Sequence, residues 1–454
     1  MVSDVLMAGL PVALREGDQD SVQRLIAEFN PADIADLIKA LTDQALDIPL
    51  LMSLDLERRA ETFGYLPIAF QVDMAARLST PALAELVTEM PSDERADLVK
   101  QLDESVRHTL FKRLAREERE DLRRLASYKE GSAGAIMTSD YASIPSGTRV
   151  SEALDILRNT APDKETIYQC YVVDADHRLL GTVSLKELIL APAHQLVDAL
   201  MLRDIVCADV DAAQEEVAKL ISRYDLLALP IVNHDEKMVG IVTYDDAMDV
   251  AEAEATEDIH KSATVGRLET NLRDASINEL YRKRVGWLVV LVFANIFTGA
   301  GIAFFEDVIA ANLALLFFLP LLVASAGNAG AQSATLMVRG LATGDVSGRD
   351  WLRLLGREIL VAGALGITMA VAVMAVGYIR AGYDIALVVA MTMVLVVMAG
   401  SLIGMVLPFA LVRFRFDPAT ASTPLITTIA DVSGVLIYFA IAASVLSIAL
   451  EIPV

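Results

Sequence analysis

Residues 424–439, PLITTIADVSGVLIYF, place a carboxylate, Asp431, in the first half of an apolar segment that runs from about residue 422 to 448. A segment of that length can span a bilayer as a helix. A carboxylate at the centre of a spanning helix costs roughly 2.5 to 3.5 kcal/mol on insertion scales. Because something must offset this cost, the stretch predicts a membrane helix in which Asp431 has a function.

Four more apolar segments precede this one, at about residues 285–305, 310–338, 358–379 and 385–412. Each is long enough to span a membrane, so the sequence predicts five transmembrane helices. Basic residues gather before the first segment and in two of the loops; they are Arg282, Lys283, Arg284, Arg339, Arg349, Arg353, Arg357, Arg413 and Arg415. The positive-inside rule then predicts a cytosolic N-terminus and a C-terminus outside.

Charge divides the chain at the first apolar segment. Residues 1–284 hold 31 basic and 52 acidic residues, and residues 285–454 hold 7 and 9. The first part, which contains all five histidines, is therefore an acidic soluble region, and its charge disfavours nucleic acid and favours cations as partners. Two cysteines without a CxxC motif indicate a reducing compartment. The N-terminus has no basic leader, so the soluble part is expected to stay in the cytosol.

The soluble region is predicted to contain two kinds of structure. Residues 1–130 show apolar residues at helical spacing, with Pro31, Pro81 and Pro91 at helix starts, which predicts a small helical superstructure. Residues 137–250 contain two similar strand-turn-strand-helix units whose Gly181 and Gly240 correspond. This duplication resembles a pair of CBS domains, expected at residues 137–200 and 201–250. The expected fold is thus multidomain: α, then CBS-type α/β, then a polytopic helical membrane domain at 285–454.

The membrane region offers hard oxygen donors. Residues 320–345 are rich in small and polar residues, among them Gly327, Asn328 and Gly330, and Thr427 and Thr428 precede Asp431. Carbonyl, amide, hydroxyl and carboxylate oxygens suit Mg²⁺ or Ca²⁺, and this region has no His or Cys for a softer metal. The alternatives are small residues that serve helix packing alone and a carboxylate paired with a base.

A connecting segment, expected as an acidic helix over 251–278, carries Glu254, Glu257 and Asp258 at helical spacing on one face. Asp417, in the loop before the fifth span, can approach from the membrane side. Like charges repel on such a face, so bound cations would let it pack against other acidic surfaces. The alternative is a solvated acidic helix face.

The order of these regions, together with the stretches EAEATEDIH, GNAGAQSATLMVRGLATGD and FDPATASTPLITTIADVSGVLIYF, resembles the MgtE magnesium transporter/channel family over nearly the whole chain. The resemblance implies a homodimer in membrane lipid with its pore on the two-fold axis and Asp431 at the Mg²⁺ site. It also implies that the acidic helix is a plug that closes the pore when cytosolic Mg²⁺ is high.

The resemblance assigns further roles. Gly327, Asn328, Gly330, Thr427 and Thr428 are expected to line the ion path. The expected cytosolic Mg²⁺ ligands are Glu254, Glu257, Asp258, Asp417, Asp246, Asp249, Glu215, Asp225, and an acid in PSDERADL, either Asp93 or Asp97. CBS pairs bind adenine nucleotides, so ATP is a further expected ligand, with Lys186, Tyr244 and Asp245 as candidate contacts; ordinary strand-to-helix turns are the alternative.

Two positions depart from the family pattern, because Ala331 and Thr423 stand where asparagines are often found. The sequence has no Walker or phosphorylation motif, so no enzymatic activity is expected. The prediction is a Mg²⁺-selective channel for influx across the bacterial inner membrane, driven by the membrane potential and closed by cytosolic Mg²⁺. The alternatives are a broader transporter of Co²⁺, Mn²⁺ or Ca²⁺, and a membrane-anchored CBS ligand sensor without transport.

Overall fold

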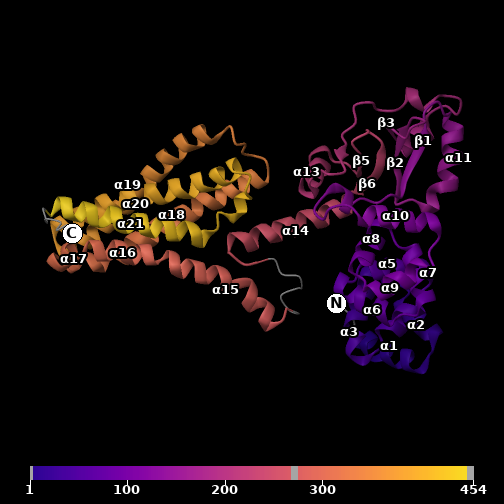
Figure 1. Cartoon of the computed structure of the whole chain (residues 1–454), viewed down its shortest axis with the longest axis horizontal. Helices are drawn as coiled ribbons and strands as arrows, with labels where there is room; N and C mark the ends of the chain where they lie inside the picture. The colour runs from indigo at the N-terminus through magenta and orange to yellow at the C-terminus, as the bar shows by residue number, and fades with distance from the viewer. Residues whose placement is uncertain (1–3, 267–274, 447–454) are drawn as a thin grey trace. The chain divides into compact units, whose positions relative to one another are not determined.

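The computed structural model describes residues 4–266 and 275–446 (Figure 1). Two compact units divide the chain, Met1–Glu252 and Ala253–Val454. The helical N-terminal region and the two-sheet region belong to the first unit, and the apolar helices belong to the second.

The first region is a stack of short helices in which elements two apart in sequence pack together (Figure 1). Thus α3 contacts α5, α5 contacts α7 and α7 contacts α9, while α6 contacts α8 and α8 contacts α10. This alternation makes two layers around a core that includes Leu37, Phe63 and Leu86. The helices are α1 (Asp4–Glu16), α2 (Gln19–Ile26), α3 (Pro31–Leu41), α4 (Asp47–Ser53), α5 (Leu56–Gly64), α6 (Ile68–Arg77), α7 (Thr80–Glu89), α8 (Ser92–Gln101), α9 (Glu104–Phe111) and α10 (Arg116–Ala126).

Two three-stranded sheets follow, each with a parallel and then an antiparallel strand pair. The duplication predicted from the sequence is therefore present in the strand order. The strands are β1 (Tyr141–Pro145), β2 (Thr166–Val173), β3 (Leu179–Ser184), β4 (Ala208–Asp209), β5 (Ala228–Val232) and β6 (Met238–Thr243), and the helices between them are α11 (Val150–Thr160), α12 (Leu185–Leu190) and α13 (Gln214–Tyr224).

The paired glycines of the duplication have a packing role. Gly181 pairs with Val172 and Gly240 with Ile231 at matching positions of the two sheets. A Cβ atom on Gly181 would lie 2.5 Å from Met201 Sδ, and one on Gly240 would lie 2.7 Å from Met137 Sδ. Each glycine thus makes room for a methionine: Met201, just before the second sheet, packs on Gly181 of the first, and Met137, just before the first sheet, packs on Gly240 of the second.

Helix α14 (Tyr244–Ser262) leaves the second sheet, and it is shorter than the predicted segment 251–278. Its end has a physical cause: Thr264 takes a left-handed conformation with φ of 59°, and the Val265 N–H donates back to the His260 carbonyl at 2.8 Å. Such a reversal satisfies the last carbonyls and ends a helix. Residues 267–274 of the predicted segment lie outside the described residues.

Five helical stretches among the described residues are long and apolar enough to cross a membrane, as predicted. The first combines α15 (Ile277–Ala294) and α16 (Ile296–Phe304), and the others are α18 (Ala314–Ala342), α19 (Trp351–Ala381), α20 (Tyr383–Arg413) and α21 (Thr423–Val445). Helix α17 (Glu306–Ala311) and the short 3₁₀ turn η5 (Pro418–Thr420) connect them. Helices α18, α20 and α21 pack against one another, and α19 packs on α20.

Candidate functional site

Asp431 meets α18 at a glycine. A Cβ atom on Gly327 would lie 3.1 Å from Thr427 Cγ2 and 3.8 Å from Asp431 Oδ1. The glycine therefore lets the backbone of α18 approach the two polar side chains of α21 that stand one helical turn apart. Asp431 and Thr427 are half-buried, and Asn328, one residue after Gly327, is exposed on the single chain. Of the expected pore residues, the structure thus brings Gly327, Thr427 and Asp431 together, and it leaves Asn328 exposed at the next position of α18.

The next turn of α18 is held tightly by α20. A Cβ atom on Gly404 would lie 2.0 Å from the Gly330 carbonyl oxygen, and one on Gly400 would lie 2.1 Å from the Ala326 carbonyl oxygen. No side chain fits at either distance, so both glycines are needed for this contact. Gly330 accordingly lies in the packed contact between α18 and α20, two residues after Asn328 on the same helix.

The two threonines before Asp431 differ in burial. Both hydroxyls donate to the Pro424 carbonyl, Thr427 at 3.0 Å and Thr428 at 2.8 Å. The donation leaves their oxygen lone pairs able to accept from water or face a cation. Thr427 is half-buried toward Gly327, whereas Thr428 is 8% exposed.

A second carboxylate in the membrane segments escaped the sequence analysis. Glu358 of α19 accepts a hydrogen bond from the Ser401 hydroxyl of α20, and Ser401 is 2% exposed. Glu358 stands at the first residue of the apolar segment predicted at 358–379, beside Arg357, where it looks like part of a flanking loop. Its position among polar neighbours in the sequence hid its role as an interhelical partner.

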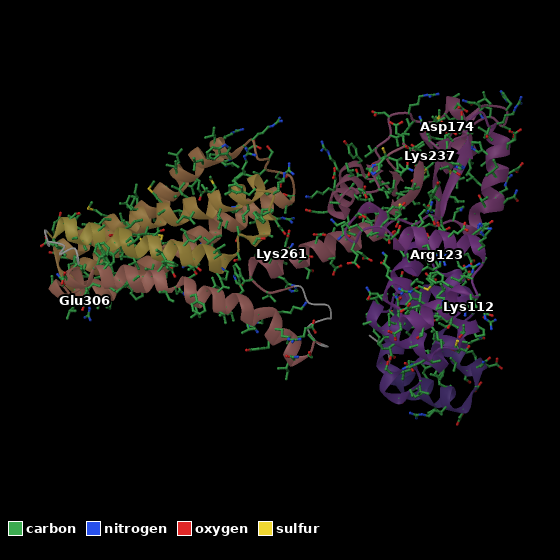
Figure 2. The ribbon with its side chains drawn as sticks, viewed as in Figure 1. Lys112, Arg123, Asp174, Lys237, Lys261 and Glu306 are labelled. Atoms are coloured by element: carbon green, nitrogen blue, oxygen red, sulfur yellow. The ribbon has the colours of Figure 1, made fainter. Side chains whose placement is uncertain are left out.

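The end of α14 is tied to the segment before α21. Figure 2 labels Lys261 near the end of α14. Its Nζ lies 2.7 Å from Glu257 Oε1 and 2.5 Å from Asp417 Oδ2. Burial lowers the pKa of Lys261, but the two carboxylates outweigh that effect and raise its pKa above the usual range. Glu254 and Asp258 share the half-buried face with Glu257, so the structure supports the expected approach of Asp417 to this face.

In the first unit, four carboxylates crowd together where α8 meets the sheets. We call Asp93, Glu94, Glu165 and Asp246 the N–CBS acidic cluster. Burial, followed by the repulsion from Asp246, Glu94 and Glu165, raises the pKa of Asp93 well above its ordinary value. Burial and neighbouring carboxylates also raise the pKa of Glu94 to about 7, that of Glu165 to about 7 and that of Asp246 to about 6. One oxygen each of Asp93 and Glu94 is buried without a hydrogen-bond partner among the described residues.

Hydrogen bonds beside this cluster tie α8 to the segment before β1 and fix Asp246. The Ser92 hydroxyl, which is fully buried, lies 2.9 Å from the Thr138 hydroxyl and accepts from the Ser139 N–H at 2.8 Å. The Thr243 hydroxyl donates to Asp246. Crowded carboxylates with raised pKa and unpartnered oxygens are the arrangement that a divalent cation neutralises. Sequence analysis offered Asp93 or Asp97; the structure places the half-buried Asp93, with a buried Oδ1, in the cluster and adds Glu94 and Glu165, which the sequence analysis had missed.

The remaining expected cytosolic ligands are spread out in the single chain. Asp97 is exposed and pairs with Lys100 at 2.9 Å, and Glu215 pairs with Lys219 at 2.7 Å. Asp225 is exposed in a left-handed conformation after α13, and Asp249 is exposed on α14. Burial and neighbouring acids raise the pKa of Asp249.

The candidate nucleotide contacts occupy matching places in the two sheet regions. Lys186 is exposed in the first turn of α12 after β3, and Tyr244 and Asp245 are exposed at the start of α14 after β6. Each thus lies at a strand-to-helix junction. This position agrees both with a nucleotide contact and with an ordinary turn.

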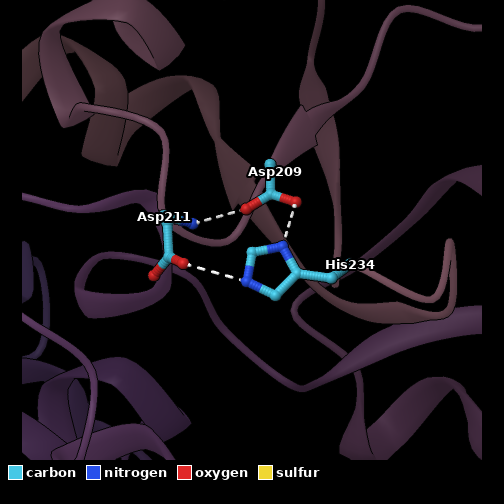
Figure 3. A group of neighbouring side chains, drawn as sticks. All are labelled: Asp209, Asp211 and His234. Carbon is cyan, nitrogen blue, oxygen red and sulfur yellow. Dashed lines mark hydrogen bonds and ion pairs between the residues drawn. The ribbon is translucent and has the colours of Figure 1, made fainter.

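Asp209, Asp211 and His234 form another charged group, on the second sheet region (Figure 3). Nδ1 of His234 lies 3.2 Å from Asp209 Oδ2, and Nε2 lies 3.2 Å from Asp211 Oδ2. His234 is 75% exposed, so these pairs are surface interactions of small energetic weight.

Comparison with known proteins covers every region described above. The model for the MgtE intracellular N domain matches residues 14–131, that for the CBS domain matches 133–194 and 197–253, and MgtE, described as a divalent cation transporter, matches 319–441. The magnesium transporter MgtE of Thermus thermophilus is 37% identical over 445 residues, which cover 97% of this chain and 98% of the relative. The chain belongs to the MgtE family.

Two further comparisons agree with this assignment. The magnesium transporter MgtE of Bacillus subtilis is 33% identical over 97% of this chain and 98% of its own. A crystal structure of the cytosolic domain of the Mg²⁺ channel MgtE in complex with ATP matches with a TM-score of 0.50 and 35% identity, over 54% of this chain and 99% of that one.

Membership of the MgtE family confirms the predicted family and fold class: a helical N-domain, a CBS pair and five apolar candidate membrane helices. The chain is thus a multi-pass membrane protein with a cytosolic N-terminal domain, and it belongs to a family of transporters rather than enzymes.

Proposed function

We propose that this protein is a channel that admits Mg²⁺ across the bacterial inner membrane, down the membrane potential. The approach of Asp431 and Thr427 to Gly327 supports the proposal, because it places a carboxylate and a hydroxyl, both hard oxygen donors, together within two apolar candidate spans. The magnesium transporters similar to this chain over 97% of its length support the choice of ion.

The ion path is proposed to lie between two copies of the chain. Asn328 is exposed and Asp431 half-exposed in the single chain, so a second copy related by a two-fold axis would face them with its own carboxylate. Two carboxylates that share one ion offset the membrane cost of each. Mg²⁺ gives up water reluctantly, so the site would hold a largely hydrated ion.

The energy for influx is sufficient without ATP hydrolysis. A potential of 100 mV contributes about 2.3 kcal/mol for each elementary charge, and a divalent ion gains about twice that. Transport would run inward because a membrane potential that is negative inside draws a cation toward the cytosol.

The cytosolic acids are proposed to close this path when Mg²⁺ is abundant. Mg²⁺ at the N–CBS acidic cluster would relieve its crowding, and Mg²⁺ at the α14 face with Asp417 would hold α14 as a plug. Acids exposed in the single chain, Asp97, Glu215, Asp225 and Asp249, would take part where surfaces meet. The ATP bound to the similar cytosolic domain supports a nucleotide at the CBS pair, near Lys186, Tyr244 and Asp245.

Mg²⁺ influx into liposomes that carry the purified protein tests the proposal. The wild type should pass Mg²⁺ at low internal Mg²⁺, and Asp431→Ala should lose most of that flux. Asp384→Asn, which neutralises an exposed acid in the first turn of α20, is the matched control and should keep it. A wild type that passes no divalent ion would favour the sensor alternative, and passage of Co²⁺, Mn²⁺ or Ca²⁺ at equal rates would favour the broader transporter. Equal flux in the wild type and Asp431→Ala would remove Asp431 from the selective site.

A further inference from the structure

Lys261 occupies the place between two carboxylates that the proposed function assigns to a divalent cation. Its ammonium lies 2.7 Å from Glu257 Oε1, on its own helix, and 2.5 Å from Asp417 Oδ2, 156 positions along the chain. The contact with Asp417 joins the last turn of α14 to the turn η5 that precedes α21. A positive charge that belongs to the protein therefore already bridges the two acidic elements.

Both carboxylate oxygens of Asp417 already have a partner. Its Oδ1 accepts the Ala419 N–H at 2.8 Å, in the first turn of η5, which leaves Oδ2 as the oxygen that faces α14. Lys261 holds that oxygen. A divalent ion that binds Asp417 toward α14 must displace the ammonium or share its oxygen, and sharing brings three positive charges within contact distance.

The contact is weak enough to be reversible. The side chains of Lys261, Glu257 and Asp417 are 35%, 24% and 38% exposed, so water reaches all three. Partly exposed ion pairs of this kind stabilise a contact only modestly. An ammonium on a flexible stem can swing into solvent while both carboxylates turn to a metal ion.

We propose that Lys261 is a tethered competitor of the regulatory divalent cation: it latches α14 to η5 without metal, and its displacement sets the Mg²⁺ concentration at which α14 locks. This inference rests on the proposed gating by α14. Two consequences follow from one side chain. Loss of the ammonium weakens the contact without Mg²⁺, because Glu257 and Asp417 then repel, and it raises the apparent Mg²⁺ affinity, because nothing has to be displaced.

Limited proteolysis of α14 in the full-length protein, titrated with MgCl₂ after EDTA treatment, tests both consequences. Lys261→Met keeps the length of the side chain and removes its charge, and Lys261→Arg keeps the charge. For Lys261→Met we expect faster cleavage in EDTA and a midpoint of Mg²⁺ protection about two- to fivefold lower than in the wild type, as the loss of a partly exposed ion pair predicts. Lys261→Arg should stay close to the wild type in both.

The two readouts distinguish a failure of this inference about Lys261 from a failure of the proposed gating by α14. Equal cleavage of the wild type and Lys261→Met in EDTA would overturn the latch, whatever Mg²⁺ does. An unchanged or higher Mg²⁺ midpoint in Lys261→Met would overturn the competition. A wild type whose cleavage ignores Mg²⁺ would overturn the proposed gating, and with it the competitor role. Because Lys261 is partly exposed, its replacement leaves no buried cavity, and matching gel-filtration profiles would show that the variants are folded.

Discussion

The membrane site and the N–CBS acidic cluster use carboxylates in opposite ways. At the proposed membrane site one carboxylate, Asp431, stands with Thr427 beside Gly327. In the cytosol four carboxylates crowd together, and burial with mutual repulsion raises the pKa of each. Conduction needs a site that binds weakly enough to release its ion, whereas a sensor needs a cluster whose conformation changes when the ion leaves.

The supporting structure differs in the same way. Gly327 meets the side chains of Thr427 and Asp431, and the same helix, α18, touches α20 backbone to backbone at Gly400 and Gly404, which leaves little room for movement. Around the N–CBS acidic cluster the contacts are hydroxyl hydrogen bonds and unpartnered carboxylate oxygens, which a change of charge can separate. The comparison teaches that one chain can build the proposed ion path on backbone contacts and the proposed ion sensor on hydrogen bonds and charged groups.

We expect the largest effect from disrupting the glycine contacts between α18 and α20. In Gly404→Val a Cβ atom would start 2.0 Å from the Gly330 carbonyl oxygen of α18. Overpacking typically costs about 1 to 3 kcal/mol, and more where the neighbour is backbone. We expect this variant to lose Mg²⁺ flux in liposomes and to melt earlier in detergent. Gly363→Val is the matched control, because its Cβ position on α19 meets open space. Normal flux in Gly404→Val would show that the α18–α20 seam does not set the ion path.

We expect an intermediate effect when the carboxylates of the N–CBS acidic cluster are titrated. The pKa values of Glu94 and Glu165 are raised from 4.5 to about 7, and that of Asp246 from 3.8 to about 6. A raised pKa means that the folded form binds more protons, so this stabilisation is complete below about pH 4 and is lost as the pH rises through about 6 to 7. In EDTA, a fragment of residues 1–262 should therefore melt a few °C higher at pH 6 than at pH 8.

Mg²⁺ and a double variant complete that measurement. Mg²⁺ at pH 8 should recover the melting temperature lost between pH 6 and 8, since it neutralises the same carboxylates. The variant Asp93→Asn with Glu94→Gln should show a flatter pH dependence, whereas Glu89→Gln, at an exposed acid at the end of α7, should follow the wild type. A melting temperature that rises with pH in EDTA would contradict the assigned crowding.

The smallest effect is expected at Glu358, a carboxylate inside the membrane unit that serves packing. Glu358→Ala would leave the buried Ser401 hydroxyl without its acceptor, at a cost of about 1 kcal/mol. Glu358→Gln keeps an acceptor oxygen and should behave nearly as the wild type. Thermal unfolding in detergent and Mg²⁺ flux would be compared for both variants. Equal damage by the two substitutions would show that the charge itself, and not the hydrogen bond, is required.

The sequence alone determined the features that depend on local pattern. Five apolar stretches predict five spans because hydropathy is a property of each segment, and the repeated units with Gly181 and Gly240 predict two sheets of one kind. The placement of Asp431 in an apolar stretch pointed to a membrane site, and helical spacing placed Glu254, Glu257 and Asp258 on one face of α14.

Only the tertiary structure decided which distant groups meet. Asp93 and Asp97 are equivalent in sequence, but the packing of α8 on the sheets places the half-buried Asp93 beside Glu165 and leaves the exposed Asp97 with Lys100. Lys261 reaches Asp417 across 156 positions and Glu358 reaches Ser401 across 43. The physical reason is that the sequence gives the type of each side chain, whereas the packing of the helices determines which side chains meet. Close packing here depends on glycines, and their role becomes visible only where two backbones touch.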